Sequence, residues 1–138
     1  MRCVLDTNIL VSAFLWQGLP GQLIERAIAE QIQLLTSQPL LDELADVLPR
    51  KHLAKKVLAT GQTVPQLLHN YQRLATRVTA RALDRPISRD LGDDNVLACA
   101  LAGKAKLIDS GDKELLVLGA FQNIPILTPV QPARCATR

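Results

Sequence analysis

Short apolar segments typical of buried strands alternate along this chain with segments of helical periodicity, and this alternation constrains the fold more than any other feature. Strands are expected at residues 2–5, 33–36, 106–109 and 125–127, with a brief one at 78–80. Helices are expected between them, at residues 11–16, 21–32, 37–48, 51–58, 63–76, 93–102 and 112–117. Strands that alternate with helices form a parallel sheet with helices on both faces, so the pattern predicts an α/β fold.

Length and composition favour one domain. The chain has 138 residues, of which 48% are apolar and 21% charged, and domains commonly run about 100–150 residues. We expect a single domain over residues 1–130, followed by a flexible basic tail at 131–138. The three cysteines are an odd number without a CxxC pair, which argues against a disulfide framework and against a thiolate zinc site. Cys3 and Cys99 are expected to be small core residues.

No segment has the character of a signal peptide, and no apolar run approaches the roughly 20 residues that span a bilayer. A cytoplasmic protein without membrane association is the resulting expectation. The net charge is only +3, but residues 47–83 contain no acidic side chain. The seven basic residues there are Arg50, Lys51, Lys55, Lys56, Arg73, Arg77 and Arg81. Such a band attracts a polyanion, although taken alone it also fits an ordinary solvated helical face.

Asp6 follows the first apolar strand directly, in the segment Asp-Thr-Asn. Parallel sheets bind ligands at the carboxyl ends of their strands, so Asp6 is interpreted as a metal ligand, with capping of the next helix as the alternative. Asp112 follows Ser110 and Gly111 after a later strand. It would reach the same edge of the sheet, again with helix capping as the alternative.

Two further acidic positions lie on predicted helices. A helical wheel places Glu43 at the rim of an apolar arc, where it either reaches a crevice or faces solvent. Asp93 and Asp94 open a helix that is apolar almost all round, and we expect one of them to cap the helix and the other to be a ligand. Asp109 is interpreted as the point where its strand leaves the core, although a fifth site residue is the alternative.

Carboxylates that lie together repel one another unless a cation neutralises them. Oxygen ligands without cysteine or paired histidine select Mg²⁺ or Mn²⁺. The two histidines, His52 and His69, fall in the basic helical segments and are expected at the surface. Jointly, the acidic positions predict a divalent metal site that acts on a polyanionic substrate.

At this point the sequence resembles the PIN domain family, and within it the toxin component of bacterial toxin–antitoxin systems (VapC-like). The resemblance covers essentially the whole chain, through "VLDTNILVSAF", "LLTSQPLLDELADVL", "RDLGDDNVLACALAGKAK" and "SGDKELLVL". It implies a three-layer α/β/α sandwich with a central, mostly parallel sheet. Its acidic quartet falls on Asp6, Glu43, Asp94 and Asp112, which the resemblance makes both catalytic residues and metal ligands. Small polar or acidic supporting residues fall on Thr7, Asn8, Asp93 and Ser110.

The resemblance implies a metal-dependent endoribonuclease that hydrolyses RNA phosphodiesters with Mg²⁺ or Mn²⁺. It also implies a cognate antitoxin and a homodimer as partners. The RNA-binding candidates are Arg50, Lys51, Lys55, Lys56, Arg73, Arg77, Arg81, Arg85 and Arg89. One alternative is a catalytically silent PIN-like module that binds RNA or protein. Another is a phosphohydrolase with Asp6 as nucleophile, which would want an aspartate where Asn8 stands.

Overall fold

A mostly parallel, six-stranded sheet forms the centre of the molecule. The computed structural model describes residues 1–15, 19–81, 83, 87 and 91–128. The strand order is β3-β2-β1-β4-β6-β5. Within these residues, β5 and β6 are the only strands that pair antiparallel. The strands are β1 (Arg2–Leu5), β2 (Gln33–Thr36), β3 (Thr76–Arg77), β4 (Leu107–Asp109), β5 (Ala120–Phe121) and β6 (Ile124–Leu127). The predicted parallel sheet is therefore confirmed.

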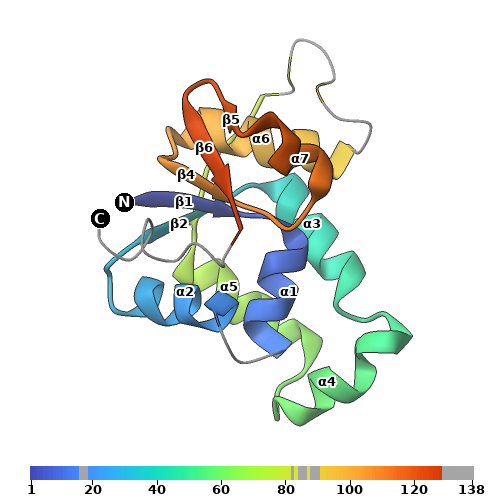
Figure 1. The fold of residues 1–138 in the computed structure, drawn as a ribbon. Helices are drawn as coiled ribbons and strands as arrows, with labels where there is room; N and C mark the ends of the chain where they lie inside the picture. Colours follow the sequence, from blue (N-terminus) through green and yellow to red (C-terminus); the bar gives the residue numbers. More distant parts are fainter. Residues whose placement is uncertain (16–18, 82, 84–86, 88–90, 129–138) are drawn as a thin grey trace.

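Helices cover both faces of this sheet, as Figure 1 shows. Helices α6 and α7 lie on one face, and α1, α2 and α5 lie on the other. The helices are α1 (Thr7–Leu15), α2 (Leu19–Ile28), α3 (Gln38–Val47), α4 (Ala54–Ala59), α5 (Val64–Leu74), α6 (Leu91–Gly103) and α7 (Lys113–Leu118), with a 3₁₀ turn at Lys51–Leu53. The arrangement is the expected three-layer α/β/α sandwich.

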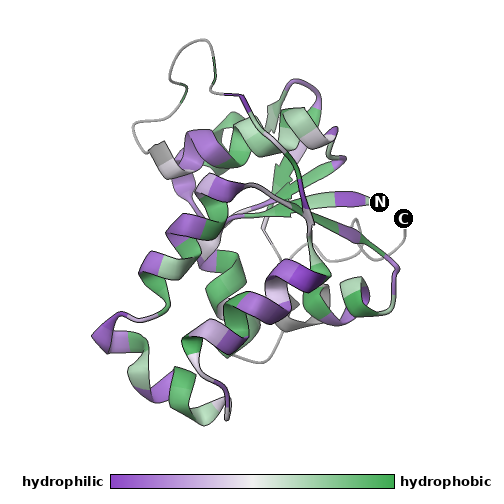
Figure 2. Cartoon of the chain, turned by 180° about the vertical axis from the view of Figure 1, so that it is seen from behind, coloured by the Kyte–Doolittle hydropathy of each residue, from purple (hydrophilic) through white to green (hydrophobic). Residues whose placement is uncertain are grey.

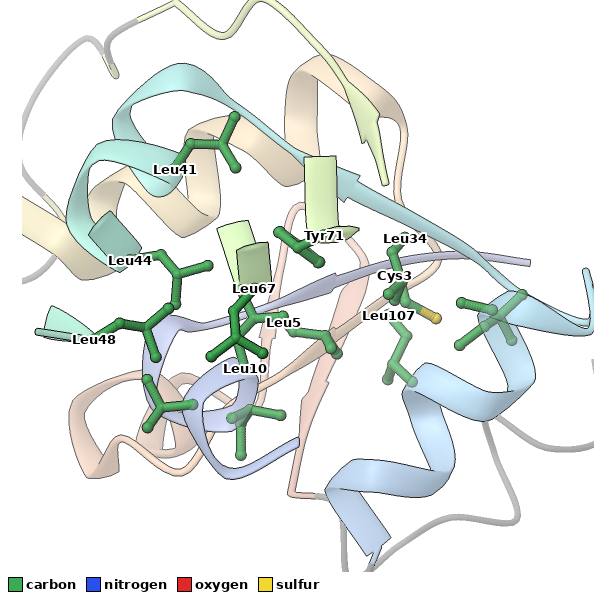
Figure 3. Close-up of a cluster of buried hydrophobic side chains, with 14 of the residues drawn as sticks. Cys3, Leu5, Leu10, Leu34, Leu41, Leu44, Leu48, Leu67, Tyr71 and Leu107 are labelled. Carbon is green, nitrogen blue, oxygen red and sulfur yellow. The ribbon is translucent and has the colours of Figure 1, made fainter. Parts of the chain in front are cut away.

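Alternation along β1 divides the apolar interior into two clusters. Cys3 and Leu5 point into the cluster beneath α1 and α5, while Val4 points into the cluster beneath α6. Figure 3 shows the first cluster, in which leucines predominate beside Cys3 and Tyr71. The central strands are mainly hydrophobic, whereas the helices mix hydrophilic and hydrophobic residues (Figure 2). Cys3 and Cys99 are fully buried in these clusters, which confirms them as small core residues.

Several element boundaries differ from the predicted ones for local reasons. Helix α1 begins at Thr7 rather than residue 11, because Asp6 accepts a hydrogen bond from the backbone N–H of Ile9 and so caps it. Helix α2 ends at Ile28, and Glu30 then adopts a left-handed backbone with φ 61°. The third strand was predicted at 78–80 but lies at Thr76–Arg77. The short strand β5 was not predicted.

The segment from α3 to α5, together with β3 and the residues after it, carries the basic residues of positions 47–83. Helix α4 projects away from the sheet (Figure 1). Thr63 and Gln66 form a reciprocal capping box that starts α5. The basic side chains of residues 47–81, together with His52 and His69, are all exposed, as expected. The tail at 131–138 lies outside the described residues.

Candidate metal centre

The carboxyl ends of the five parallel strands, β3, β2, β1, β4 and β6, lie along one edge of the sheet. The strand registers place Arg77 beside Thr36 at the ends of β3 and β2. They place Leu5 beside Asp109 at the ends of β1 and β4. Asp6 comes directly after Leu5, so it lies just outside this row. The prediction that Asp6 and the residues after Asp109 share one edge is therefore confirmed.

Asp6 is a buried carboxylate that holds together two segments of this edge. It is only 5% exposed. One carboxylate oxygen accepts the Ile9 N–H at 2.9 Å, and the other accepts a hydrogen bond from the Ser110 hydroxyl. Burial raises the pKa of Asp6, the hydrogen bonds from Ser110, Ile9 and Gly111 oppose that rise, and the charge of Asp112 adds to it. Asp6 is thus a helix cap that also lies within the electrostatic reach of Asp112.

Ser110 connects Asp6 to Asp112. Its hydroxyl oxygen accepts a hydrogen bond from the backbone N–H of Asp112 at 2.9 Å, and its hydroxyl group donates a hydrogen bond to the Asp6 carboxylate. Ser110 has no exposed surface, so this arrangement is shielded from competition by water. The supporting position predicted for Ser110 is therefore matched by two direct contacts.

Three carboxylates come together where α6 and α7 begin. Asp93, Asp112 and Glu114 each offer an oxygen within 4.8 Å of the other two. Asp112 also caps α7 by accepting the N–H of Glu114 at 2.8 Å, so its capping and ligand interpretations are compatible. Sequence reasoning missed Glu114. The signal available was its spacing, since a residue two positions after Asp112 in the first turn of the same helix stays close to it.

The structure separates Asp93 from Asp94. Asp94 is 8% exposed and accepts the N–H of Ile87 at 3.2 and 3.3 Å through its two oxygens. It therefore ties the preceding segment to the start of α6, while Asp93 faces Asp112. Glu43 is half-buried on α3, as its rim position predicted. Within the described part of the chain, neither Glu43 nor Asp94 belongs to the three-carboxylate group.

Asp109 corrects the interpretation favoured from the sequence. The strand does not leave the core at this residue, because Asp109 is 3% exposed between Leu5 and Leu127. One of its oxygens, Oδ2, has no hydrogen-bond partner among the described residues. Burial, and then the charge of Asp6, raise the pKa of Asp109 to about 7. A buried carboxyl group of this kind is costly to ionise.

The remaining predicted site residues differ in how exposed their side chains are. Thr7 is buried at the start of α1, and Asn8 is exposed, so their supporting roles stay predictions. Arg50 pairs with Asp46 at 3.5 Å on the surface. Arg85 and Arg89 lie outside the described residues.

The donor set fits a hard divalent cation. Three carboxylates this close repel one another, and a divalent cation would offset that repulsion. Their ligand atoms are all oxygens, which suits Mg²⁺ or Mn²⁺. Both described cysteines are in the core, and both histidines are exposed on other elements. Asp93, Asp112 and Glu114, with Asp6 beside them, are therefore the residues that could hold the ion.

The chain is thus a mostly parallel α/β sandwich with a group of carboxylates that could hold a divalent cation. The family comparison is more specific. The model of the PIN domain matches residues 2–114, so the chain belongs to the PIN domain family. PIN domains are generally metal-dependent nucleases that bind nucleic acids. No curated protein matched the chain.

None of the helices in the described ranges is long and apolar enough to cross a membrane. This finding agrees with the absence of a long apolar run in the sequence.

Proposed function

We propose that this chain is a metal-dependent endoribonuclease that acts as the toxin of a toxin–antitoxin pair in the cytoplasm. The observation that carries the proposal is the meeting of Asp93, Asp112 and Glu114 within 4.8 Å, beside buried Asp6, in a chain of the PIN family. The exposed basic residues of the middle third support a polyanionic substrate.

Each acidic residue has a defined part in this proposal. Asp93, Asp112 and Glu114 provide carboxylate oxygens for Mg²⁺ or Mn²⁺. Asp6 adds a fourth carboxylate to this group from the end of β1. Glu43 and Asp94 would act as outer residues of the site, Glu43 from the rim of α3. Asp94 does so by fixing the segment that precedes Asp93 through its contact with Ile87.

A bound ion of this kind lowers the pKa of water and stabilises the charge that develops on a phosphate under attack. The protein's own contribution is positional. Ser110 donates a hydrogen bond to the Asp6 carboxylate and accepts the backbone N–H of Asp112, so it orients the Asp6 side chain and holds the Asp112 backbone next to it. Because Asp6 is shielded from water, its charge is screened less than that of an exposed carboxylate.

The phosphohydrolase alternative is less well supported. A phosphohydrolase of that type would want a second aspartate two positions after the nucleophile, and Asn8 stands at that position.

The proposal also includes the protein partners that the resemblance implies, an antitoxin and a second copy of the chain. A surface hollow between α1, α2 and α5 supports an interaction on that side. It is lined by Phe14, Ile28, Asn70, Tyr71, Arg73 and Leu74. Ile28 is 66% exposed there, so the hollow offers apolar surface that a partner could cover.

The test is cleavage of a fluorescent single-stranded RNA by the purified chain with Mn²⁺, with Mg²⁺, and with EDTA. We expect metal-dependent cleavage that falls more than about 100-fold in Asp6→Asn and in Asp112→Asn, since even outer partners of a metal site commonly contribute 10–100-fold. Asp46→Asn is the matched control, because it removes an exposed carboxylate on α3 and should leave the rate unchanged.

Two results would contradict the nuclease. Cleavage that persists equally in all three variants would come from a contaminating enzyme. RNA that is bound but not cut by the parent protein would favour the silent RNA-binding module instead.

A further inference from the structure

One basic residue of the middle third differs from the others in its place on the sheet. Arg77 ends β3, and its partner in the register is Thr36, the last residue of β2. Val4 pairs with Leu35, one residue before Thr36, so Leu5 is level with Thr36 and Arg77. Arg77 therefore lies on the carboxyl edge, two strands away from the strand that leads into Asp6. At about 4.8 Å between strands, that separation is roughly 10 Å.

The Arg77 side chain is held in place by a short chain of hydrogen bonds. Its Nη1 donates to Gln38 Oε1 at 3.1 Å, and Gln38 Nε2 donates to Asp42 Oδ1 at 2.8 Å. The orientation of the Gln38 amide is fixed by its neighbours. A flipped amide would set its NH₂ against a guanidinium that only donates, and its oxygen against a carboxylate that only accepts. Gln38 and Asp42 therefore fix Arg77 from the first two turns of α3.

This contact uses only part of the Arg77 hydrogen-bonding capacity. A guanidinium carries five N–H donors in a planar fork, and only one is assigned to Gln38. The side chain is exposed. Its charge is also not paired directly with a carboxylate among the described ion pairs, whereas Arg50 is paired with Asp46. Arg77 is thus oriented and still able to bind an anion.

We propose that Arg77, positioned by Gln38, binds a backbone phosphate next to the scissile one, so that single-stranded RNA lies across the carboxyl edge of the sheet from β4 towards β3. This inference rests on the proposed ribonuclease function and adds the path of the substrate to it. A planar fork binds a phosphate with two parallel hydrogen bonds. Because Arg77 lies two strands from β1 and three strands from β4, it would contact a phosphate other than the one at the acidic group.

The chain offers a matched control for Arg77 at the opposite edge of the sheet. Arg26 also donates from Nη1 to a glutamine oxygen, that of Gln31, at 3.0 Å. Gln31 lies just before β2 begins, so Arg26 is at the amino edge. Arg26→Ala and Arg77→Ala remove the same charge and the same type of anchor. The two variants differ in that Arg77→Ala removes the charge from the carboxyl edge of the sheet and Arg26→Ala removes it from the amino edge.

The experiment measures binding of a fluorescein-labelled single-stranded RNA by anisotropy in EDTA, at several salt concentrations. We expect Arg77→Ala to weaken binding about fivefold and to lower the slope of log K against log salt by about 0.7, the value for one phosphate contact on a single strand. Arg26→Ala should change neither quantity. Equal effects of the two variants, no effect of Arg77→Ala, or no RNA binding by the parent would each overturn the inference.

The positioning role of Gln38 has a separate readout. In a cleavage assay, Gln38→Met should raise KM with little change in kcat, because it disorders Arg77 and has no contact with Asp6, Asp93, Asp112 or Glu114 among the described hydrogen bonds. The same substitution should have no further effect in an Arg77→Ala background. An additive effect would mean that Gln38 acts independently of Arg77. Failure of the nuclease proposal remains distinguishable, since RNA that binds in an Arg77-dependent way but is never cut would contradict only the enzyme.

Discussion

The two edges of the same sheet differ in what they bury. At the amino edge, Arg2, Gln33 and Lys106 are exposed, and the strands are joined by ordinary backbone hydrogen bonds. At the carboxyl edge, Asp6 and Asp109 are both at most 5% exposed. Burying a charged group is costly unless it is compensated. The amino edge shows that the strands of this sheet can end without buried acidic residues. The buried acidic residues at the carboxyl edge therefore indicate a functional site.

The sharpest way to test this contrast is to separate the two adjacent aspartates of α6. Asp93→Asn removes a member of the three-carboxylate group, while Asp94→Asn alters a contact with the Ile87 backbone. We expect Asp93→Asn to weaken Mn²⁺ binding about 100-fold and Asp94→Asn to weaken it about tenfold at most. Titration of the protein with Mn²⁺, followed by electron paramagnetic resonance of the free ion, measures both.

The reverse order would assign the ligand role to Asp94, as the family resemblance does, and would leave Asp93 as the supporting residue. Circular dichroism of both variants provides the control, because α6 must remain folded for the comparison to hold. Equal losses would mean that the two carboxylates act as one unit.

Asp109 tests the energetic cost of the buried acids. Its pKa in the folded protein is about 7, against an ordinary value of 3.8. Between these values the folded state binds more protons than the unfolded state, so stability falls as pH rises. We expect the free energy of unfolding in EDTA to fall by about 2 kcal/mol from pH 5 to pH 7. Asp109→Asn should remove most of that fall, as urea denaturation at each pH would show.

A smaller fall should remain in Asp109→Asn, because the pKa of Asp6 is raised as well. Asp46→Asn is again the control, since this exposed carboxylate should leave the pH dependence unchanged. A parent protein whose stability is the same at pH 5 and pH 7 would show that Asp109 ionises without cost. Burial of Asp109 at the carboxyl edge would then cost less free energy than its low exposure indicates.

The sequence predicted the sheet and the positions of Asp6 and Asp112 just after its strands, because both depend on local patterns. Buried strands have uninterrupted apolar runs, and Asp6 and Asp112 directly follow such runs. The sequence could not distinguish Asp93 from Asp94, since both lie in the first turn of a helix that is apolar on all sides. That choice depends on how α6 is rotated against α7. It also could not predict the burial of Asp109 or the Gln38–Arg77 contact, which join segments far apart along the chain.

Ser110 and Ser37 are two buried serines at the carboxyl edge of the sheet that differ in their contacts. Ser110 follows β4 and Ser37 follows β2, and each is at most 1% exposed. Ser110 bonds to Asp6 and Asp112, whereas Ser37 lies against Cys99 of α6. We expect Ser110→Ala to lower Mn²⁺ affinity and RNA cleavage about tenfold, since the Asp6 carboxylate and the Asp112 backbone N–H lose their shared partner. Ser37→Ala should change neither. If both substitutions lower cleavage alike, the effect comes from packing at the sheet edge, and the hydrogen bonds of Ser110 have no special part in it.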